Sequence, residues 1–218
     1  MKLGQKIKMD CQLKNYFKME KLKHETFIEI RLKNPGYLTE FFADIQTFKQ
    51  LVKKIDKHSE TDYQLFNLDG PEKFKGDIFE IFTEIFFKLY SSHNKIGVYD
   101  YQPVPDVLDN GVDGIGVGND EKPIAIQAKY KSNVTAVLTS KDLKQFPYHA
   151  IVKYKVEPTG NLILFTSGKG LHWHSENEVF QGTIKTIGYQ AISSFIDNNT
   201  VFWKNCLNLI RKPLIYNL

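Results

Sequence analysis

The stretch Pro123-Ile124-Ala125-Ile126-Gln127-Ala128-Lys129-Tyr130 decides how this chain folds. Read as a strand, it places the apolar side chains of Ile124, Ile126 and Ala128 on one face. Side chains alternate between the two faces of a strand, so Gln127 and Lys129 point together, away from Ile126 and Ala128. A buried ammonium without a partner is unfavourable, so we expect an anionic group to lie beside this pair.

The segment before this strand supplies a carboxylate. Asn110-Gly111-Val112-Asp113-Gly114-Ile115-Gly116 places Asp113 at the start of a strand, and the turn-forming residues 118–120 predict a hairpin. The hairpin would bring Asp113 close to Gln127 and Lys129. Taken alone, an aspartate between two glycines is equally compatible with ordinary turn chemistry.

An upstream helix supplies further carboxylates. Residues 74–92 place apolar side chains at three- and four-residue spacings, with Glu80 and Glu84 one turn apart on another side. If this row faces the strand ends, Glu80 joins Asp113. Solvated helix positions are the alternative for both glutamates, and Glu84 is the rival of Glu80. Carboxylate and amide oxygens suit Mg²⁺ or Mn²⁺ better than zinc.

The other predicted elements alternate between helices and strands, which indicates an α/β fold. The N-terminal part has a strand predicted over 25–32 and an amphipathic helix over 36–56. Turn-forming residues at 67–71 predict a junction between a mainly helical, lysine-rich segment, 1–70, and a main domain, 71–218. The main domain is predicted to contain the helix 74–92, strands over 96–102, 112–118 and 123–130, a helix near 140–152 capped by Thr139 or Ser140, strands over 161–166 and 183–187, and helices over 189–196 and 200–211.

The composition excludes several classes of protein. Hydrophobic residues make up 42% of the 218 residues, enough for a core and too many for disorder. No window approaches the roughly 18 consecutive apolar residues of a membrane span, and the lysine-rich start lacks the apolar stretch of a signal peptide. We therefore expect a soluble, cytoplasmic protein that does not bind a membrane and is not secreted. Cys11 and Cys206 form no Cys-x-x-Cys pair, so neither a disulfide framework nor a thiolate zinc site is expected.

The net charge of +4 is unevenly distributed. Residues 1–24 hold seven lysines and two acids, 105–122 hold five acids and one lysine, and 129–155 hold six lysines and one aspartate. An acidic cluster beside a basic run suits a metal-dependent enzyme acting on a polyanion, although charge alone fits solvated loops as well. Three lysines of the basic run are the candidate phosphate contacts: Lys131, Lys141 and Lys144.

Together these motifs resemble the restriction endonuclease-like fold of the PD-(D/E)XK nuclease superfamily. Phe79-Glu80, Gly111-Val112-Asp113 and Gln127-Ala128-Lys129 follow one another in the pattern of its Mrr-like branch. The residues up to about 170 also resemble nuclease-like domains fused to predicted helicases. The fold implied is a helix, a three-stranded meander, a helix and a strand, with a mixed sheet flanked by helices. The N-terminal mainly helical segment would be an extension of this core.

The resemblance implies a role for each motif residue. The metal ligands would be Asp113, Gln127, Glu80 and the carbonyl oxygen of Ala128. Lys129 would orient and activate the attacking water and offset developing phosphate charge. Gln127 stands where many relatives have glutamate, and a neutral ligand holds a cation less firmly, so more of the binding falls on Glu80.

The activity implied is hydrolysis of DNA phosphodiester bonds by a Mg²⁺- or Mn²⁺-dependent endonuclease. DNA would be the partner, and a homodimer or a helicase-type partner protein is compatible with the resemblance. Two alternatives stay open. A catalytically weak or inactive DNA-binding or docking module of a helicase-type machine would retain DNA in a salt-dependent manner without products. A junction-resolving nuclease would prefer four-way DNA to linear duplex.

Overall fold

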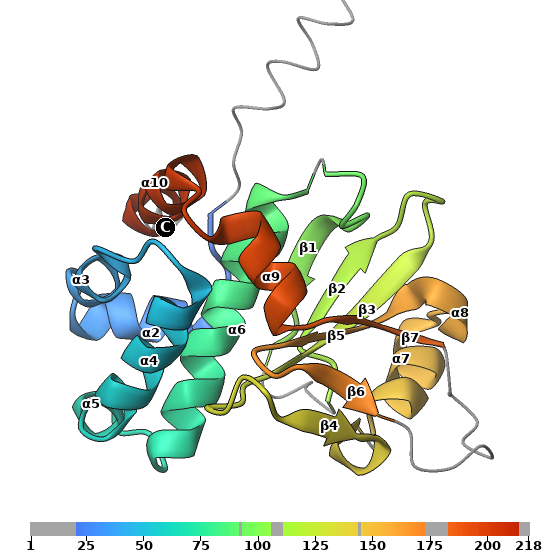
Figure 1. Ribbon diagram of the computed structural model, residues 1–218, viewed down its shortest axis with the longest axis horizontal. Helices are drawn as coiled ribbons and strands as arrows, with labels where there is room; N and C mark the ends of the chain where they lie inside the picture. The colour runs from blue at the N-terminus through green and yellow to red at the C-terminus, as the bar shows by residue number, and fades with distance from the viewer. Residues whose placement is uncertain (1–20, 92, 106–110, 144, 173–182, 214–218) are drawn as a thin grey trace, which may run out of the picture.

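The computed structural model describes residues 21–91, 93–105, 111–143, 145–172 and 183–213. They form a mixed α/β fold in which a five-stranded sheet is flanked by helices, as the sequence predicted (Figure 1). The helices and strands are, in chain order, α2 (Glu25–Lys33), α3 (Tyr37–Phe42), α4 (Phe48–Ser59), α5 (Asp62–Leu65), α6 (Pro71–Leu89), β1 (Tyr99–Pro103), β2 (Gly114–Val117), β3 (Pro123–Lys129), β4 (Val137–Thr139), η2 (a 3₁₀ turn, Ser140–Leu143), α7 (Phe146–Tyr154), α8 (Pro158–Asn161), β5 (Leu162–Thr166), β6 (Gly170–His172), β7 (Ile184–Ile187), α9 (Tyr189–Ile196) and α10 (Thr200–Arg211).

The main sheet has the strand order β1-β2-β3-β5-β7. The first three strands form an antiparallel meander, and β5 and β7 run parallel to β3. Strand β3 is therefore central, with the hairpin partner β2 on one side and β5 on the other. A second, two-stranded parallel sheet pairs β4 with β6.

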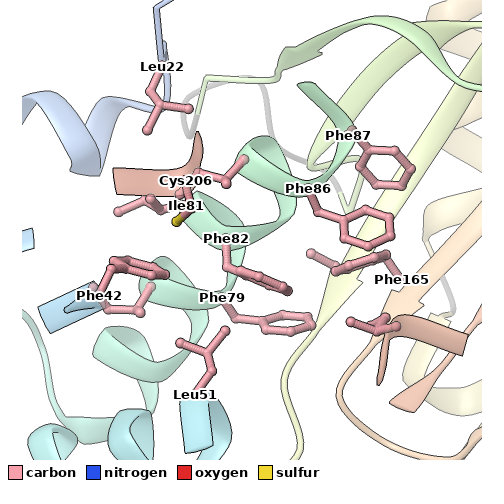
Figure 2. Packing of buried hydrophobic residues seen from close by; sticks show 14 of the residues in the cluster. Leu22, Phe42, Leu51, Phe79, Ile81, Phe82, Phe86, Phe87, Phe165 and Cys206 are labelled. Atoms are coloured by element: carbon pink, nitrogen blue, oxygen red, sulfur yellow. The ribbon is translucent and has the colours of Figure 1, made fainter. Parts of the chain in front are cut away.

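Helix α6 is the centre of the hydrophobic core. It lies between the sheet and the N-terminal helices, so nearly all of its sides are buried (Figure 1). Four of its phenylalanines surround Phe165 of β5 with ring centroids 5.0 to 6.2 Å apart, and Figure 2 shows these rings together; they are Phe79, Phe82, Phe86 and Phe87. This aromatic contact fixes α6 against one face of the sheet.

The two faces of β3 belong to different hydrophobic clusters. Ile126 and Ala128 pack in the cluster that contains α6, whereas Ala125 packs in the cluster that contains Phe146 of α7. The alternation predicted for this strand is therefore confirmed. By the same alternation Gln127 and Lys129 share the face of Ala125.

The N-terminal helices share a core with the rest of the chain. One cluster includes Phe41 of α3 and Phe48 of α4 together with Phe74 and Phe82 of α6. The rings of Phe48 and Phe82 are stacked with centroids 5.5 Å apart. The predicted segment 1–70, as far as it is described, thus packs directly on the first helix of the predicted main domain.

The strand predicted over 25–32 is wrong, because these residues form helix α2. The buried side chains Thr26, Phe27 and Ile30 lie on one helical face, and the apparent alternation ends in Leu32, which is 61% exposed. Arg31 donates hydrogen bonds to the carbonyl oxygens of Ile210 and Lys212 at the end of α10. Such tertiary contacts override a short alternating pattern.

The single helix predicted over 36–56 is two helices, α3 and α4. The chain turns between them at Asp44, which has a left-handed backbone conformation with φ of 60°. Thr47 then caps α4 with a capping box, in which its hydroxyl accepts from the Gln50 N–H and the Gln50 side chain accepts from the Thr47 N–H. The Thr-x-x-Gln signal for a new helix was therefore present in the sequence.

The helix predicted near 140–152 begins later than expected. Residues 140–143 form the 3₁₀ turn η2, and α7 starts at Phe146 with Pro147 in its first turn. Proline has no N–H and is tolerated at a helix start, so it favours a new start here. The predicted cap Thr139 instead donates its N–H to the Asp142 side chain.

The other predicted helices and strands are confirmed, with small shifts of boundary. The strands at 161–166 and 183–187 and the helices at 189–196 and 200–211 begin within one residue of the observed β5, β7, α9 and α10. The strand predicted from 112 starts at Gly114, because the ladder with β3 is interrupted there. In the described part of the chain, no helix is both long enough and apolar enough to cross a membrane.

Candidate active site

Three of the polar residues predicted from the sequence, Asp113, Gln127 and Lys129, lie at the carboxyl end of β3. Strand β2 pairs with β3 only as far as the pair Gly114–Ile126. Strand β5 continues alongside β3 as far as the pair Thr166–Lys129. The Lys129 carbonyl accepts hydrogen bonds from the Thr166 hydroxyl at 2.7 Å and from the Ser167 N–H at 3.4 Å. The end of β3 is thus held firmly on its β5 side and leaves its β2 side free for other contacts.

Asp113 lies at an irregularity in the β2–β3 hairpin. Its N–H donates to the Ile126 carbonyl at 3.0 Å, yet Ile126 already faces Gly114 in the ladder. Two residues of one strand therefore oppose one residue of the other, which is the arrangement of a β-bulge. The glycine is required, because a Cβ at position 114 would overlap the ring of Tyr101.

The bulge directs the Asp113 carboxylate to the backbone of β3. Its Oδ2 accepts a 2.6 Å hydrogen bond from the Ala128 N–H, and Asp113 is only 6% exposed. The N–H and C=O of one residue point to the same side of an antiparallel strand. The carbonyl of Ala128, a ligand predicted from the sequence, therefore points to the same side as Asp113.

Gln127 is a buried amide with an unsatisfied acceptor. It is 3% exposed, and its Oε1 has no hydrogen-bond partner in the described residues. Its Nε2 lies 3.1 Å from the position that a Cβ would occupy at Gly111, which has a φ of 84°. Leaving such a group unpaired costs about 1–3 kcal/mol, so the site favours a further partner for this oxygen.

Lys129 follows on the same face of the strand as Gln127. Its side chain is half-buried, and within the described residues its ammonium has neither a hydrogen bond nor an ion pair. Neighbouring lysines are occupied instead: Lys131 lies 3.4 Å from Asp142. Lys129 is thus a cation held at the strand end without a counter-charge from the described part of the protein.

The carboxylates of α6 differ in how they are used. Glu84 is fully buried and accepts hydrogen bonds from the N–H groups of Lys23 at 2.7 Å and His24 at 2.9 Å, and it pairs with Lys88 at 2.9 Å. Glu80 is 23% exposed and contacts the His24 Nε2 at 2.9 Å. Glu84 is therefore a structural carboxylate, and Glu80 keeps one oxygen without a partner among the described residues.

The hydroxyl of Tyr101 lies near carboxylates from both elements. Burial raises its pKa well above the usual value, and the charges of Glu84, Asp113 and Glu80 raise it further. Its hydroxyl also lies 3.4 Å from the Asp113 carbonyl oxygen. Tyr101 is thus a neutral group that contacts both Phe87 of α6 and the backbone of the bulge.

The site residues do not all share one face of the sheet. Helix α6, with Glu80, covers the face of Ile126 and Ala128, whereas Gln127 and Lys129 lie on the other face. Asp113 stands at the strand end between them. In the part of the chain that is described, no three His, Cys, Asp or Glu side chains gather closely enough to hold a metal ion. A cation here would therefore need the neutral oxygens of Gln127 and Ala128.

No model of a known protein family matches the chain, and no curated protein is significantly similar to it. The candidate site accordingly rests on its own geometry. The sequence singled out Asp113, Gln127 and Lys129, which lie at one strand end, but it did not single out His24, which contacts Glu80. That residue is 56 positions from Glu80 and carries no local signal.

His24 is surrounded by acids. Burial lowers its pKa, but the hydrogen bond with Glu80 and the charges of Glu80, Glu84 and Asp77 raise it overall. Asp77 lies on the same helix, where burial raises its pKa to about 6 despite an ion pair with Lys73 at 2.6 Å. The strip of α6 that faces His24 is therefore densely charged and largely out of solvent.

The three lysines predicted to contact phosphates differ in exposure and in their partners. Lys141 is exposed, and Lys131 is half-buried and directed to Asp142. Lys144 lies outside the described residues, as do most of the seven lysines in residues 1–24. Of the three predicted phosphate contacts, only Lys131 and Lys141 thus lie in the described part of the chain.

A pocket lies at the opposite end of β3. It is lined by residues that include Gly118, Asn119, Ile124, Asn161 and Lys185. At about 3.3 Å per residue, the five residue steps from Ile124 to Lys129 separate it from the candidate site by roughly 17 Å. The pocket is thus not part of the site predicted from the sequence.

Proposed function

We propose that the protein is a metal-dependent endonuclease that hydrolyses DNA phosphodiester bonds, built on the restriction endonuclease-like core of the PD-(D/E)XK superfamily in its Mrr-like form. The order of α6, the antiparallel β1–β2–β3, α7 and the parallel strand β5 supports this core. One observation carries the proposal: the Asp113 carboxylate is bound to the backbone N–H of Ala128, between Gln127 and Lys129.

The residues fit a hard divalent cation. Asp113 supplies a carboxylate, the Ala128 carbonyl points to the same side, and the buried Gln127 Oε1 lacks a partner among the described residues. Oxygen ligands of this kind are those that Mg²⁺ and Mn²⁺ prefer. Glu80 would be the second carboxylate. When bound, the cation would polarise the phosphodiester and lower the pKa of an attacking water.

The protein's own groups would do the rest. Lys129 would hold the attacking water by a hydrogen bond and offset the charge that develops on the phosphate, because its ammonium has no other partner in the described residues. Thr166 and Ser167 would keep that lysine in place through its carbonyl oxygen. Lys141 and Lys131 would contact phosphates of the DNA on either side.

A binding function is the second candidate. The site has few acids, because Gln127 replaces a carboxylate and Glu80 is tied to His24. A site of this charge binds a cation weakly, which favours a DNA-binding or docking module of a helicase-type machine. Such a module would hold DNA with an affinity that falls steeply with salt, and it would release no products.

One experiment separates the two candidates. The full chain is incubated with supercoiled, linear, four-way and single-stranded DNA and with RNA, each with Mg²⁺, Mn²⁺ or a chelator. The nuclease proposal expects cleavage of DNA with a divalent cation and none with the chelator. Retention of DNA without products under every condition would favour the binding module, and a strong preference for four-way DNA would indicate a junction-resolving nuclease.

A further inference from the structure

Residues 21–24, here called the strap, cross helix α6 before α2 begins. Lys88 of α6 donates to the Lys21 carbonyl at 2.6 Å. Leu22 is 2% exposed and belongs to the same cluster as Ile81, near which Figure 2 shows it. The strap is thus part of the folded core, although it lies outside the stretch that resembles the nuclease family.

The strap is anchored by Glu84. The two oxygens of this buried carboxylate accept the N–H groups of Lys23 and His24, one each. The Lys23 ammonium reaches further and donates to Gln102 of β1 at 2.9 Å. The strap therefore ties α6 to the edge of the sheet. The backbone of His24 is held by Glu84, which places its ring beside α6.

The ring of His24 in turn contacts Glu80. Its Nε2 lies 2.9 Å from Oε2 of Glu80, and His24 is 3% exposed. Its other nitrogen, Nδ1, is buried without a partner in the described residues. The Glu80 Oε1 is likewise without a partner there. One oxygen of Glu80 is thus held by the strap, and the other has no partner among the described residues.

We propose that His24 is a positioning residue, which fixes the Glu80 carboxylate for divalent-cation binding, while Glu84 serves only to anchor the strap. The inference rests on the proposed function and deepens it. A partner that binds one oxygen of a ligating carboxylate restricts its orientation, and removal of such partners typically weakens metal binding about 10- to 100-fold. The strap thereby contributes to a site whose other residues come from 80–129.

The test measures Mn²⁺ affinity of the full chain by the loss of the free Mn²⁺ paramagnetic resonance signal. In His24→Gln the side-chain amide nitrogen occupies roughly the place of Nε2, whereas in His24→Asn it occupies that of Nδ1 and cannot reach Glu80. We expect His24→Asn to weaken Mn²⁺ binding about 10-fold or more, and His24→Gln to stay within about 3-fold of the unsubstituted chain.

Two further variants distinguish positioning from general damage. Leu22→Ala removes packing from the strap but not the contact with Glu80, so it should lower the thermal midpoint by about 5–10 °C and leave Mn²⁺ affinity unchanged. In a Glu80→Gln background, His24→Asn should cause no additional loss of affinity, because its effect passes through Glu80. Additive losses would overturn the positioning role.

The remaining outcomes separate this inference from the proposed function. If the unsubstituted chain binds Mn²⁺ and His24→Asn binds it equally well, the positioning role is overturned while the nuclease proposal stands. If the unsubstituted chain does not bind Mn²⁺, the proposed function fails and the inference fails with it. If Glu84→Gln loses Mn²⁺ as Glu80→Gln does, with its thermal midpoint unchanged, the division of roles between the two glutamates is wrong.

Discussion

The Asp113 carboxylate and the Ala128 N–H are joined by a 2.6 Å hydrogen bond across a hairpin whose ladder has already ended at Gly114. A side chain thus replaces the backbone partner that β2 no longer supplies. The bulge that produces this contact depends on close packing of Gly114 against Tyr101. Gly114 therefore links the candidate site to the hydrophobic core.

Gly114→Ala should damage both stability and the site. The new Cβ would overlap the Tyr101 ring, which is 2% exposed and stacked on Phe87 with centroids 5.2 Å apart, so neither can move easily. We expect the free energy of unfolding in urea to fall by about 1–3 kcal/mol, as for other overpacked cores.

Gly76→Ala is the matched control for this substitution. A Cβ at position 76 would have nothing within 4 Å, and the residue lies inside α6. Alanine is the better helix former, so this variant should gain about 0.5–1 kcal/mol. Equal changes in the two variants would contradict the close packing described at Gly114.

Gln127→Glu should exchange stability for metal binding. A charge at a side chain that is 3% exposed is unfavourable without a partner, so the metal-free variant should lose roughly 2 kcal/mol of unfolding free energy. Saturating Mn²⁺ should restore stability, because a ligand that binds only the folded state shifts unfolding by mass action. Thermal unfolding with and without Mn²⁺ measures both effects.

The exposed Gln64 provides the comparison. Gln64→Glu should unfold like the unsubstituted chain, and Mn²⁺ should not affect it differently. A Gln127→Glu variant that Mn²⁺ stabilises no more than the unsubstituted chain would argue against a cation at the end of β3.

The sequence predicted the elements whose signals are local. The alternation in 123–130 and the apolar face of 74–92 depend on neighbouring residues alone, and both were correct. The strand predicted at 25–32 is wrong, because Phe27 and Ile30 are buried by packing against other helices, α3 and α6 among them. The split of 36–56 is encoded locally, by the capping box of Thr47 and Gln50.

The residues of the candidate site could likewise be predicted only where their signals are local. Asp113, Gln127 and Lys129 come from one hairpin, so their placement at one strand end followed from the turn between them. The choice between Glu80 and Glu84 could not follow from helix periodicity, because the two lie on one side of α6. It depends on backbone donors at Lys23 and His24, about 60 residues away.

Asp62 should make the free energy of unfolding depend on pH in the acidic range. Burial alone would raise its pKa, but hydrogen bonds from Tyr37, His58 and Thr61 lower the pKa below its usual value of 3.8. A carboxyl with a lowered pKa stabilises the fold above the unfolded-state pKa, and this contribution is lost as the pH falls below about 4.

Asp62→Asn removes this charge. The variant should lose about 1–3 kcal/mol of unfolding free energy at pH 7, and the difference from the unsubstituted chain should narrow below pH 4. Urea unfolding between pH 3 and 7 would show it. The exposed Asp69→Asn is the control and should change little at any pH. A difference for Asp62→Asn that is constant with pH would contradict the network.

Phe165→Ala should be among the most destabilising single substitutions in the core. The ring of Phe165 meets four phenylalanines of α6 and is fully buried. Its loss should cost about 3–5 kcal/mol, measured by urea unfolding. Leu65→Ala, at a side chain that is 63% exposed, should change stability by less than about 0.5 kcal/mol. Comparable losses in both would mean that α6 does not rest on β5 as described.

The most direct test follows nicking of supercoiled DNA in Mn²⁺ over time by the unsubstituted chain and three variants. Asp113→Asn and Lys129→Met alter the two ends of the candidate site. Lys122→Met removes a lysine from the other end of β3, where it pairs with Glu157 at 2.6 Å. The account predicts nicking by the unsubstituted chain and by Lys122→Met, with a loss of at least about 100-fold in the other two. Equal nicking by all four proteins, or none by the unsubstituted chain, would contradict it.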